Sequence, residues 1–191
     1  LIDEKRAKPA HKLKVGNVVK IDFNPDELSA VPQIELPLIY EDEDCIVVNK
    51  PAGVLTHSKG AFNPEATVAS FITPKLKGIS GERGGIVHRL DRATSGVIIC
   101  AKTDQARSWL QKQFSTRKVK KTYYAVIEGK LSPASAIIDM PIERNPRQPQ
   151  TFRVGSHGKS AKTTYKTIKE GDFSLVMLTP ETGRTHQLRV H

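Results

Sequence analysis

Short runs of hydrophobic residues, several of them alternating with polar ones, recur along the chain and predict β-strands. The clearest runs cover residues 18–23, 38–40, 45–50, 95–103 and 121–129, with shorter candidates at 135–139 and 150–154. Two further strands are predicted within residues 160–171 and 172–180, where Glu170-Gly171-Asp172 is a hairpin signal.

Helical periodicity is confined to a few segments. Residues 65–72 predict a short helix with the acidic Glu65 near its start. Residues 103–114 predict a longer helix capped by Thr103 or Asp104. Its expected apolar stripe consists of Ala106, Trp109, Leu110 and Phe114. Residues 181–191 read as a turn followed by the start of a helix.

Strands in hairpins with few helices favour an α+β fold with a largely antiparallel or mixed sheet over a doubly wound parallel sheet. Residues 24–37 contain three prolines and little periodicity, which is typical of a linker. Residues 74–85 are rich in glycine, lysine and proline and predict a loop. The chain begins at Leu1 and stops at His191 within a predicted helix, so we expect the C-terminal region to be incomplete.

The charge changes this picture. The 191 residues carry a formal net charge of +10 and a pI near 9.7, which favours a polyanionic partner, most commonly a nucleic acid. The sequence contains no run of about 18 apolar residues, so we expect no membrane-spanning helix. Cys45 and Cys100 lie in apolar runs without zinc-ligand spacing, so we interpret them as buried thiols of a reduced, cytoplasmic protein.

A single carboxylate in a basic setting is the first candidate for chemistry. Asp91 lies between Arg89 and Arg92, shortly after His88 and before an apolar strand. Nearby positive charge favours the ionised carboxylate, which could act as a nucleophile or as a general base. The plainer interpretation is a surface ion pair, since such pairs are common and contribute little.

Other catalytic patterns are missing from the sequence. The Gly-Lys-Ser core within 158–164 lacks the preceding glycine of a phosphate-binding loop, and no GxSxG motif occurs. The histidines at 88, 186 and 191 lack metal-ligand spacing, and arginines flank the first two, so we expect no metal.

Residues 112–126 combine lysines and an arginine with Tyr123 and Tyr124. On a strand the two tyrosines face opposite sides, so one can pack in the core while the other faces a site. This pattern suits an RNA backbone with a stacked base, and it equally suits cations at a helix C-terminus followed by a core strand. Farther along, Arg184 falls in the first turn of a helix, where an anion should compensate it. Asp91 is our hypothesis for that anion.

Four segments together resemble the RluA-type pseudouridine synthases. These are "VNKPAGVLTHS" (48–58), "HRLDRATSG" (88–96), "KTYYA" (121–125) and "GRTHQLRVH" (183–191), and their order and spacing agree over about residues 36–191. Ser58 stands where many members have proline, which affects a loop rather than the chemistry. Residues 8–22 resemble the end of an S4-type RNA-binding domain.

The resemblance implies a cofactor-free isomerase that converts uridine to pseudouridine in RNA. Asp91 corresponds to the catalytic aspartate, which attacks either the sugar C1′ or the uracil C6. Tyr123 corresponds to the tyrosine that packs against the target base, and Arg184 to the arginine that pairs with the aspartate. Arg89 corresponds to the residue that fills the gap left by the flipped nucleotide. The remaining expected substrate contacts are His88, Arg92, Lys121 and Leu188.

The resemblance also sets the expected architecture and partners. We expect a long mixed, mostly antiparallel sheet flanked by helices and loops, with a remnant of the S4-like domain and linker at 1–28 and the catalytic domain at 29–191. The expected partner of this monomer is RNA, ribosomal RNA of the large subunit first and tRNA second, with no membrane. The alternatives are a non-catalytic RNA-binding or ribosome-assembly module on the same scaffold and, more weakly, a metal-dependent nuclease.

Overall fold

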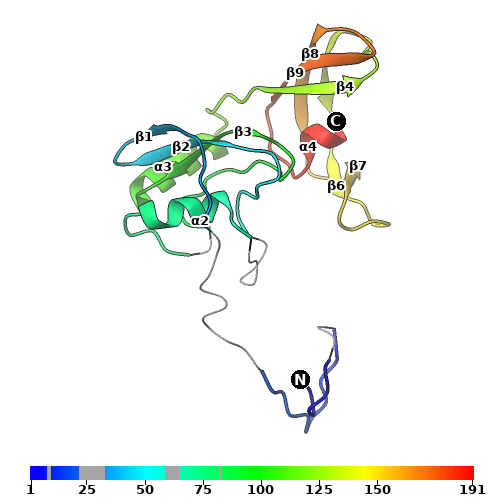
Figure 1. Ribbon diagram of the computed structural model, residues 1–191. Coiled ribbons are helices and arrows are strands. Elements are labelled where there is room, and N and C mark those ends of the chain that lie inside the picture. The colour runs from blue at the N-terminus through cyan, green and yellow to red at the C-terminus, as the bar shows by residue number, and fades with distance from the viewer. Residues whose placement is uncertain (8–9, 22–32, 59–64, 82) are drawn as a thin grey trace.

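The computed structural model describes residues 1–7, 10–21, 33–58, 65–81 and 83–191 (Figure 1). Its strands are β1 (Leu38–Glu41), β2 (Cys45–Lys50), β3 (Gly96–Ala101), β4 (Tyr123–Glu128), β5 (Ser135–Asp139), β6 (Ile142–Arg144), β7 (Phe152–Val154), β8 (Lys162–Lys169) and β9 (Phe173–Pro180). Its helices are α2 (Val68–Ile72), the 3₁₀ turn η1 (Thr73–Lys75), α3 (Asp104–Ser115) and α4 (Gln187–Val190).

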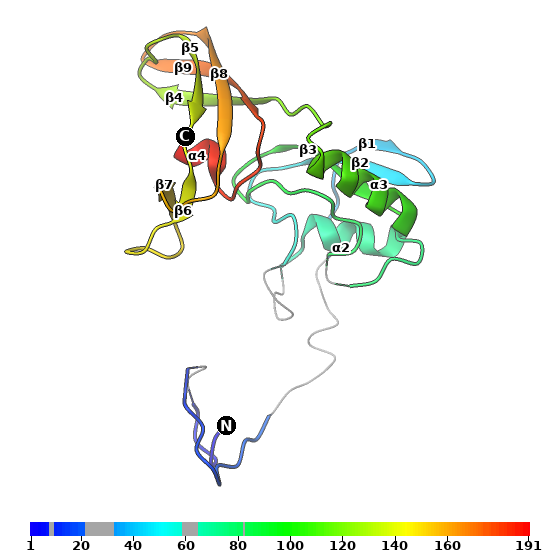
Figure 2. The same cartoon turned by 180° about the vertical axis from the view of Figure 1, so that it is seen from behind.

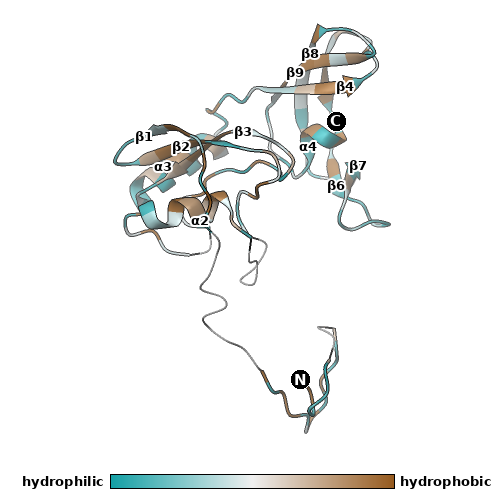
Figure 3. Cartoon of the chain, in the orientation of Figure 1, coloured by the Kyte–Doolittle hydropathy of each residue, from teal (hydrophilic) through white to brown (hydrophobic). Residues whose placement is uncertain are grey.

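Strands β1, β2 and β3 form one antiparallel sheet in that order. The period of two along β2 turns Ile46, Val48 and Lys50 to the same buried side. Helix α2 begins with a capping box, in which Thr67 and Ser70 each bond the other's backbone N–H. Figure 3 shows that α2 and β2 are strongly hydrophobic. Their buried apolar side chains form the main core together with Leu36, Ile86, Leu90, Ile98 and Cys100.

Helix α3 starts where the sequence predicts, because the Thr103 side chain accepts a hydrogen bond from the Ala106 backbone N–H. Leu110 and Ala106 pack against Ala101 and Ile79. The prediction that Trp109 belongs to the apolar stripe is wrong, since this side chain is 60% exposed. Adjacent residues of a helix point about 100° apart around its axis, so Trp109 lies outside the face that Leu110 buries.

Strands β4, β9, β8 and β5 form a second antiparallel sheet, in which β8 and β9 are the predicted hairpin. The short pair β6–β7 and helix α4 lie beside it (Figure 2). Tyr123 packs against the main core and Tyr124 on the other side of β4 is 64% exposed. The predicted opposition of the two tyrosines is therefore confirmed.

The structure confirms the α+β class and the antiparallel pairing. It differs from the expected single long sheet, because the described strands form separate sheets of three, four and two strands. Strand β6 was not predicted. The N-terminal strand expected at 18–23 appears as an isolated bridge at Val19, and positions 22–23 lie outside the described residues.

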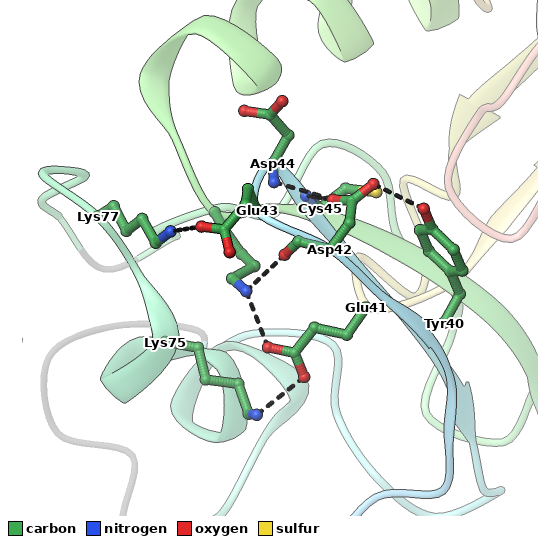
Figure 4. Close-up of polar contacts among 9 residues, drawn as sticks. Tyr40, Glu41, Asp42, Glu43, Asp44, Cys45, Lys75 and Lys77 are labelled. Carbon is green, nitrogen blue, oxygen red and sulfur yellow. Dashed lines mark hydrogen bonds and ion pairs between the residues drawn. The ribbon is translucent and has the colours of Figure 1, made fainter.

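A cluster of oppositely charged side chains surrounds the turn between β1 and β2 (Figure 4). Glu41 accepts from the ammonium groups of Lys102 at 2.9 Å and Lys75 at 3.0 Å. Lys77 pairs with Glu43. Hydrogen bonds from the Cys45 N–H, the Tyr40 hydroxyl and the Asp44 N–H, in that order of effect, lower the pKa of Asp42 to about 2. The cluster ties the β1–β2 turn to the segments before β3 and α3.

The three-stranded and four-stranded sheets lie side by side as separate halves of the molecule in both views, and residues 1–7 and 10–21 lie apart from them (Figures 1 and 2). Cys45 and Cys100 are free thiols, half-buried and buried respectively. Among the described residues, no helix is long and apolar enough to cross a membrane.

Candidate active site

The segment that carries Asp91 is held in place from both ends. The Gly85 carbonyl accepts a hydrogen bond from the Ala101 N–H at 2.8 Å, and a Cβ on Gly85 would lie 1.8 Å from the Ala101 carbonyl oxygen. Only glycine allows the segment to approach β3 this closely. At the other end, the Thr56 hydroxyl donates to the Leu90 carbonyl at 2.8 Å and accepts from the Leu90 N–H at 3.2 Å. Asp91 therefore follows two fixed points.

A fully buried lysine supports the same segment. The Lys50 ammonium donates to the carbonyls of Pro51 at 2.9 Å, Val54 at 2.8 Å and Arg92 at 3.2 Å. The Arg92 carbonyl also accepts the Gly53 N–H at 2.8 Å. Burial lowers the pKa of Lys50 and the negative charge of Asp91 opposes that shift. Lys50 thus joins the turn after β2 to the Asp91 segment and adds positive potential near the carboxylate.

Asp91 is mostly covered, with 19% of its side chain exposed. Its Oδ2 lies 3.9 Å from Nη1 of Arg189 and 4.0 Å from Nε2 of His186. His186 adopts a left-handed backbone conformation with φ of 57°, which is uncommon for a residue with a side chain and is often found at functional sites. The Asp91 carboxylate lies in one half of the molecule, and the Arg189 and His186 side chains nearest to it lie in the other.

The expected pairing of Asp91 with Arg184 is not what the structure has. Arg184 donates from Nε to the Ser160 carbonyl at 2.9 Å, and the guanidinium nearest Asp91 belongs to Arg189. Arg184 still reaches the same pocket as Asp91. The turn between the two arginines decides this outcome, because Gln187 accepts the Arg184 N–H and directs the chain into α4.

A pocket of about 140 Å³ contains the candidate residues. Leu90, Asp91, Lys121 and Tyr123 line it together with the segment 182–189. Burial raises the pKa of Tyr123, and the Asp91 charge raises it further, so the phenol remains protonated at neutral pH. A mostly covered carboxylate beside an aromatic ring and several cations suits an anionic substrate with a flat ring.

The other predicted substrate contacts divide into two groups. Arg89, Lys121 and Leu188 line the pocket, and the Lys121 ammonium also donates to the Thr182 carbonyl at 3.3 Å. Arg92 turns away from it and forms two contacts with Glu65 at 2.7 and 3.0 Å.

His88 lies behind the pocket. Its Nε2 accepts the Ile99 N–H at 3.1 Å and its ring stacks on Phe114 at 4.6 Å. Burial, with a smaller contribution from Lys121, lowers the pKa of His88 to about 4. The sequence expectation of no metal stays a prediction; among the residues that the structure describes, no group of three potential ligands converges.

The buried, neutral His88 predicts a stability change with pH. The unfolded chain takes up a proton near pH 6.5 and the folded chain only near pH 4, so stability is fully present above pH 6.5 and falls as the pH is lowered toward 4. This loss amounts to at most about 3 kcal/mol. In thermal melts from pH 7.5 to 4.5, His88→Gln should be less stable than the parent protein at pH 7.5, with the difference shrinking on acidification. Since burial also lowers the pKa of His57, the difference between the two proteins is the measured quantity, and parallel curves would contradict the assignment.

The site residues selected from the sequence did not include several supporting residues: Lys50, Thr56, His186, Gln187 and Arg189. Lys50 could have been found, because it shares the period-two face of Ile46 and Val48 and precedes a Pro-Ala-Gly turn. Gln187 is buried, and its side chain bonds Thr182, Thr163, the Lys162 carbonyl and the Arg184 N–H. No local pattern predicts that set of partners.

Comparison with known proteins places this geometry in a family. Residues 44–191 match the family model described as RNA pseudouridylate synthase. An uncharacterized RNA pseudouridine synthase of Aquifex aeolicus is 38% identical over 98% of the chain and 62% of its own length. Ribosomal large subunit pseudouridine synthase D of Borreliella burgdorferi is 40% identical over 91% of the chain and 56% of its own length. The chain thus spans less than two thirds of these relatives.

Solved structures agree on the fold. Human RNA pseudouridylate synthase domain containing 1 superposes with a TM-score of 0.66 at 29% identity, covering 82% of the chain and 64% of its own. The human domain containing 4 protein gives a TM-score of 0.64 at 27% identity, covering 81% and 62%. With the matched segment including Asp91, Tyr123 and the residues around α4, the chain belongs to the RNA pseudouridylate synthase family.

Proposed function

We propose that the protein isomerises uridine to pseudouridine within RNA, with Asp91 as the catalytic residue. The observation that carries this proposal is the position of Asp91. It is a mostly covered carboxylate on a doubly anchored segment, in one pocket with Tyr123 and with cations from the other half of the molecule. Family membership and the net charge of +10 support it.

The reaction breaks the bond from C1′ of the ribose to N1 of uracil and forms a bond from C1′ to C5. Asp91 forms a transient covalent bond, either to C1′ or to C6 of the base, and this bond breaks again before the product leaves, which regenerates the carboxylate. The uracil ring turns within the pocket so that C5 faces C1′. The C5 proton then leaves to a base or to water, and N1 gains a proton, so atoms and charge balance without a redox partner.

The chain's own residues supply positioning and electrostatics. Tyr123, fixed by the core on one side, packs against the extruded base, since an enzyme that modifies a base must first take it out of the stack. Arg89 occupies the space that the base leaves in the RNA. Arg184 and Arg189 approach from the other half and neutralise phosphate or carboxylate charge, and Lys121 and Leu188 contact the nucleotide.

We propose ribosomal RNA of the large subunit as the substrate. Several relatives bear this target in their names, among them ribosomal large subunit pseudouridine synthase C of Vibrio parahaemolyticus, which is 32% identical over the full chain and 62% of its own length. The S4-like character of residues 1–28 belongs to the same proposal, as does a boundary between that segment and a catalytic domain at 29–191. Within these bounds, residues 8–9 and 22–32 lie outside the described part of the chain.

The direct test uses RNA labelled with tritium at uracil C5, because pseudouridine formation releases this label to water. We expect the protein to release tritium from unmodified large-subunit RNA and not from unmodified tRNA. Binding of both RNAs without release would identify a non-catalytic RNA-binding module and overturn the proposed activity. Release from tRNA alone would retain the activity and reject the ribosomal target.

A further inference from the structure

A basic groove of about 500 Å³ adjoins the catalytic pocket. The pocket and the groove share Arg89, Lys121, Tyr123 and Arg184, so the two spaces are continuous. The groove extends from there to the C-terminal end of α3, where Phe114 and Arg117 line it. It therefore leads away from Asp91 along a wall formed by a helix end.

Four cations face this groove: Arg89, Arg117, Lys121 and Arg184. Within the described ranges, no carboxylate lies within 4.0 Å of their charged nitrogens. The groove's one acidic wall residue among those described, Glu181, is paired with Lys162 at 3.3 Å. Arg117 also lies near enough to Lys121 to lower its pKa by repulsion, in addition to the larger effect of burial. Like charges held together without counter-charges are arranged for an anion.

The backbone at Arg117 gives an independent reason to assign it a binding role. The Arg117 N–H bonds the Phe114 carbonyl at 3.1 Å and the Lys118 N–H bonds the Gln113 carbonyl at 3.0 Å, the two hydrogen bonds of a Schellman motif. The residue at this position has a left-handed backbone, with φ of 59°. Glycine is strongly favoured there, because a side chain is strained. The chain instead places an arginine at this position, beside the groove.

We propose that this groove binds the RNA phosphodiester backbone next to the target uridine, with Arg117 as a phosphate contact. The proposal rests on the proposed function for the identity of the polyanion. RNA fits the groove better than a free small anion, because the cations are spread along a channel that opens into the catalytic pocket. A strand whose base enters the pocket carries its neighbouring phosphates past Lys121 and Arg117.

The test compares Arg117→Gly, Arg117→Gln and the control Lys169→Gln, which removes an exposed cation from the end of β8, outside the groove. The probe is a fluorescein-labelled RNA hairpin with uridines in its loop, and binding is followed by anisotropy over a range of KCl concentrations. Both Arg117 variants should bind about tenfold more weakly. Their plots of log Kd against log salt should be shallower by about 0.7 to 0.9, whereas Lys169→Gln should match the parent protein.

Thermal melting separates this role from a purely structural one. Arg117→Gly relieves the left-handed strain and should melt about 2–4 °C higher while it binds RNA less well. A lower melting temperature with unchanged affinity and salt dependence would mean that Arg117 serves the helix end, and would overturn the proposal. Failure of the proposed function is seen separately, as RNA binding without tritium release by the parent protein.

Discussion

Asp91→Asn should abolish tritium release from uracil-labelled RNA, with a loss of at least about 10⁴-fold. An amide of the same shape leaves the hydrogen bonds from Thr56 to Leu90 and from Lys50 to Arg92 in place. It cannot, however, form the covalent bond to C1′ or C6. RNA affinity should be equal or higher, because a negative charge beside the substrate's phosphates is removed.

The matched control is Asp172→Asn, which neutralises an exposed carboxylate in the turn between β8 and β9. This variant should release tritium at the parent rate. If Asp91→Asn retained parental turnover while Asp172→Asn behaved as expected, another residue would perform the covalent step. A large fall in the melting temperature of Asp91→Asn would instead show that the contacts of Asp91 with Arg189 and His186 stabilise the fold.

Among the described glycines of the first half, Gly85 is the one where we expect substitution by alanine to be most damaging. The new Cβ would lie 1.8 Å from the Ala101 carbonyl oxygen and 2.9 Å from its carbon, and both atoms belong to the backbone of β3. The segment must move away, which breaks the 2.8 Å bond from the Ala101 N–H to the Gly85 carbonyl. We expect a loss of at least about 3 kcal/mol and a melting temperature lower by about 6–12 °C.

Gly129→Ala is the informative comparison for this result. Gly129 has φ of 78° and no neighbour within 4 Å of an added Cβ, so its substitution measures backbone strain alone, about 1 kcal/mol. Equal losses in the two variants would show that crowding at Gly85 is relieved by a small shift. A larger loss at Gly85, accompanied by reduced tritium release per folded molecule, would show that this glycine also sets the position of Asp91.

The elements most accurately predicted from the sequence are those with strong local signals. Thr103 caps α3 and the Glu170–Asp172 turn joins β8 to β9, as predicted. Asp91, Tyr123 and Arg184 were selected from short motifs, and the structure brings all three to one pocket. Their convergence depends on contacts between segments far apart in the chain, which periodicity does not encode; the resemblance of the motifs supplied it.

The predictions that differ from the structure depend on the conformation of single turns and on hydrogen bonds between distant segments. Which arginine approaches Asp91 depends on the left-handed turn at His186 and on the hydrogen bonds of Gln187, and no sequence signal marks either feature. Lys50 was placed at the end of the predicted strand 45–50, but no role was predicted for its side chain, because lysine is rarely buried. It is buried because three carbonyls surround its ammonium, and these carbonyls converge only in the folded chain.

The pocket is also the joint between the two halves. Asp91 lies in one half, and Arg189, His186 and the backbone that receives Lys121 lie in or beside the other. An RNA strand bound there would contact both halves and hold them in one relative position. Because RNA binds the folded form, it would also raise the stability of the protein by mass action. Conversely, a solvent or temperature that separates the two halves should abolish activity while each sheet is still folded.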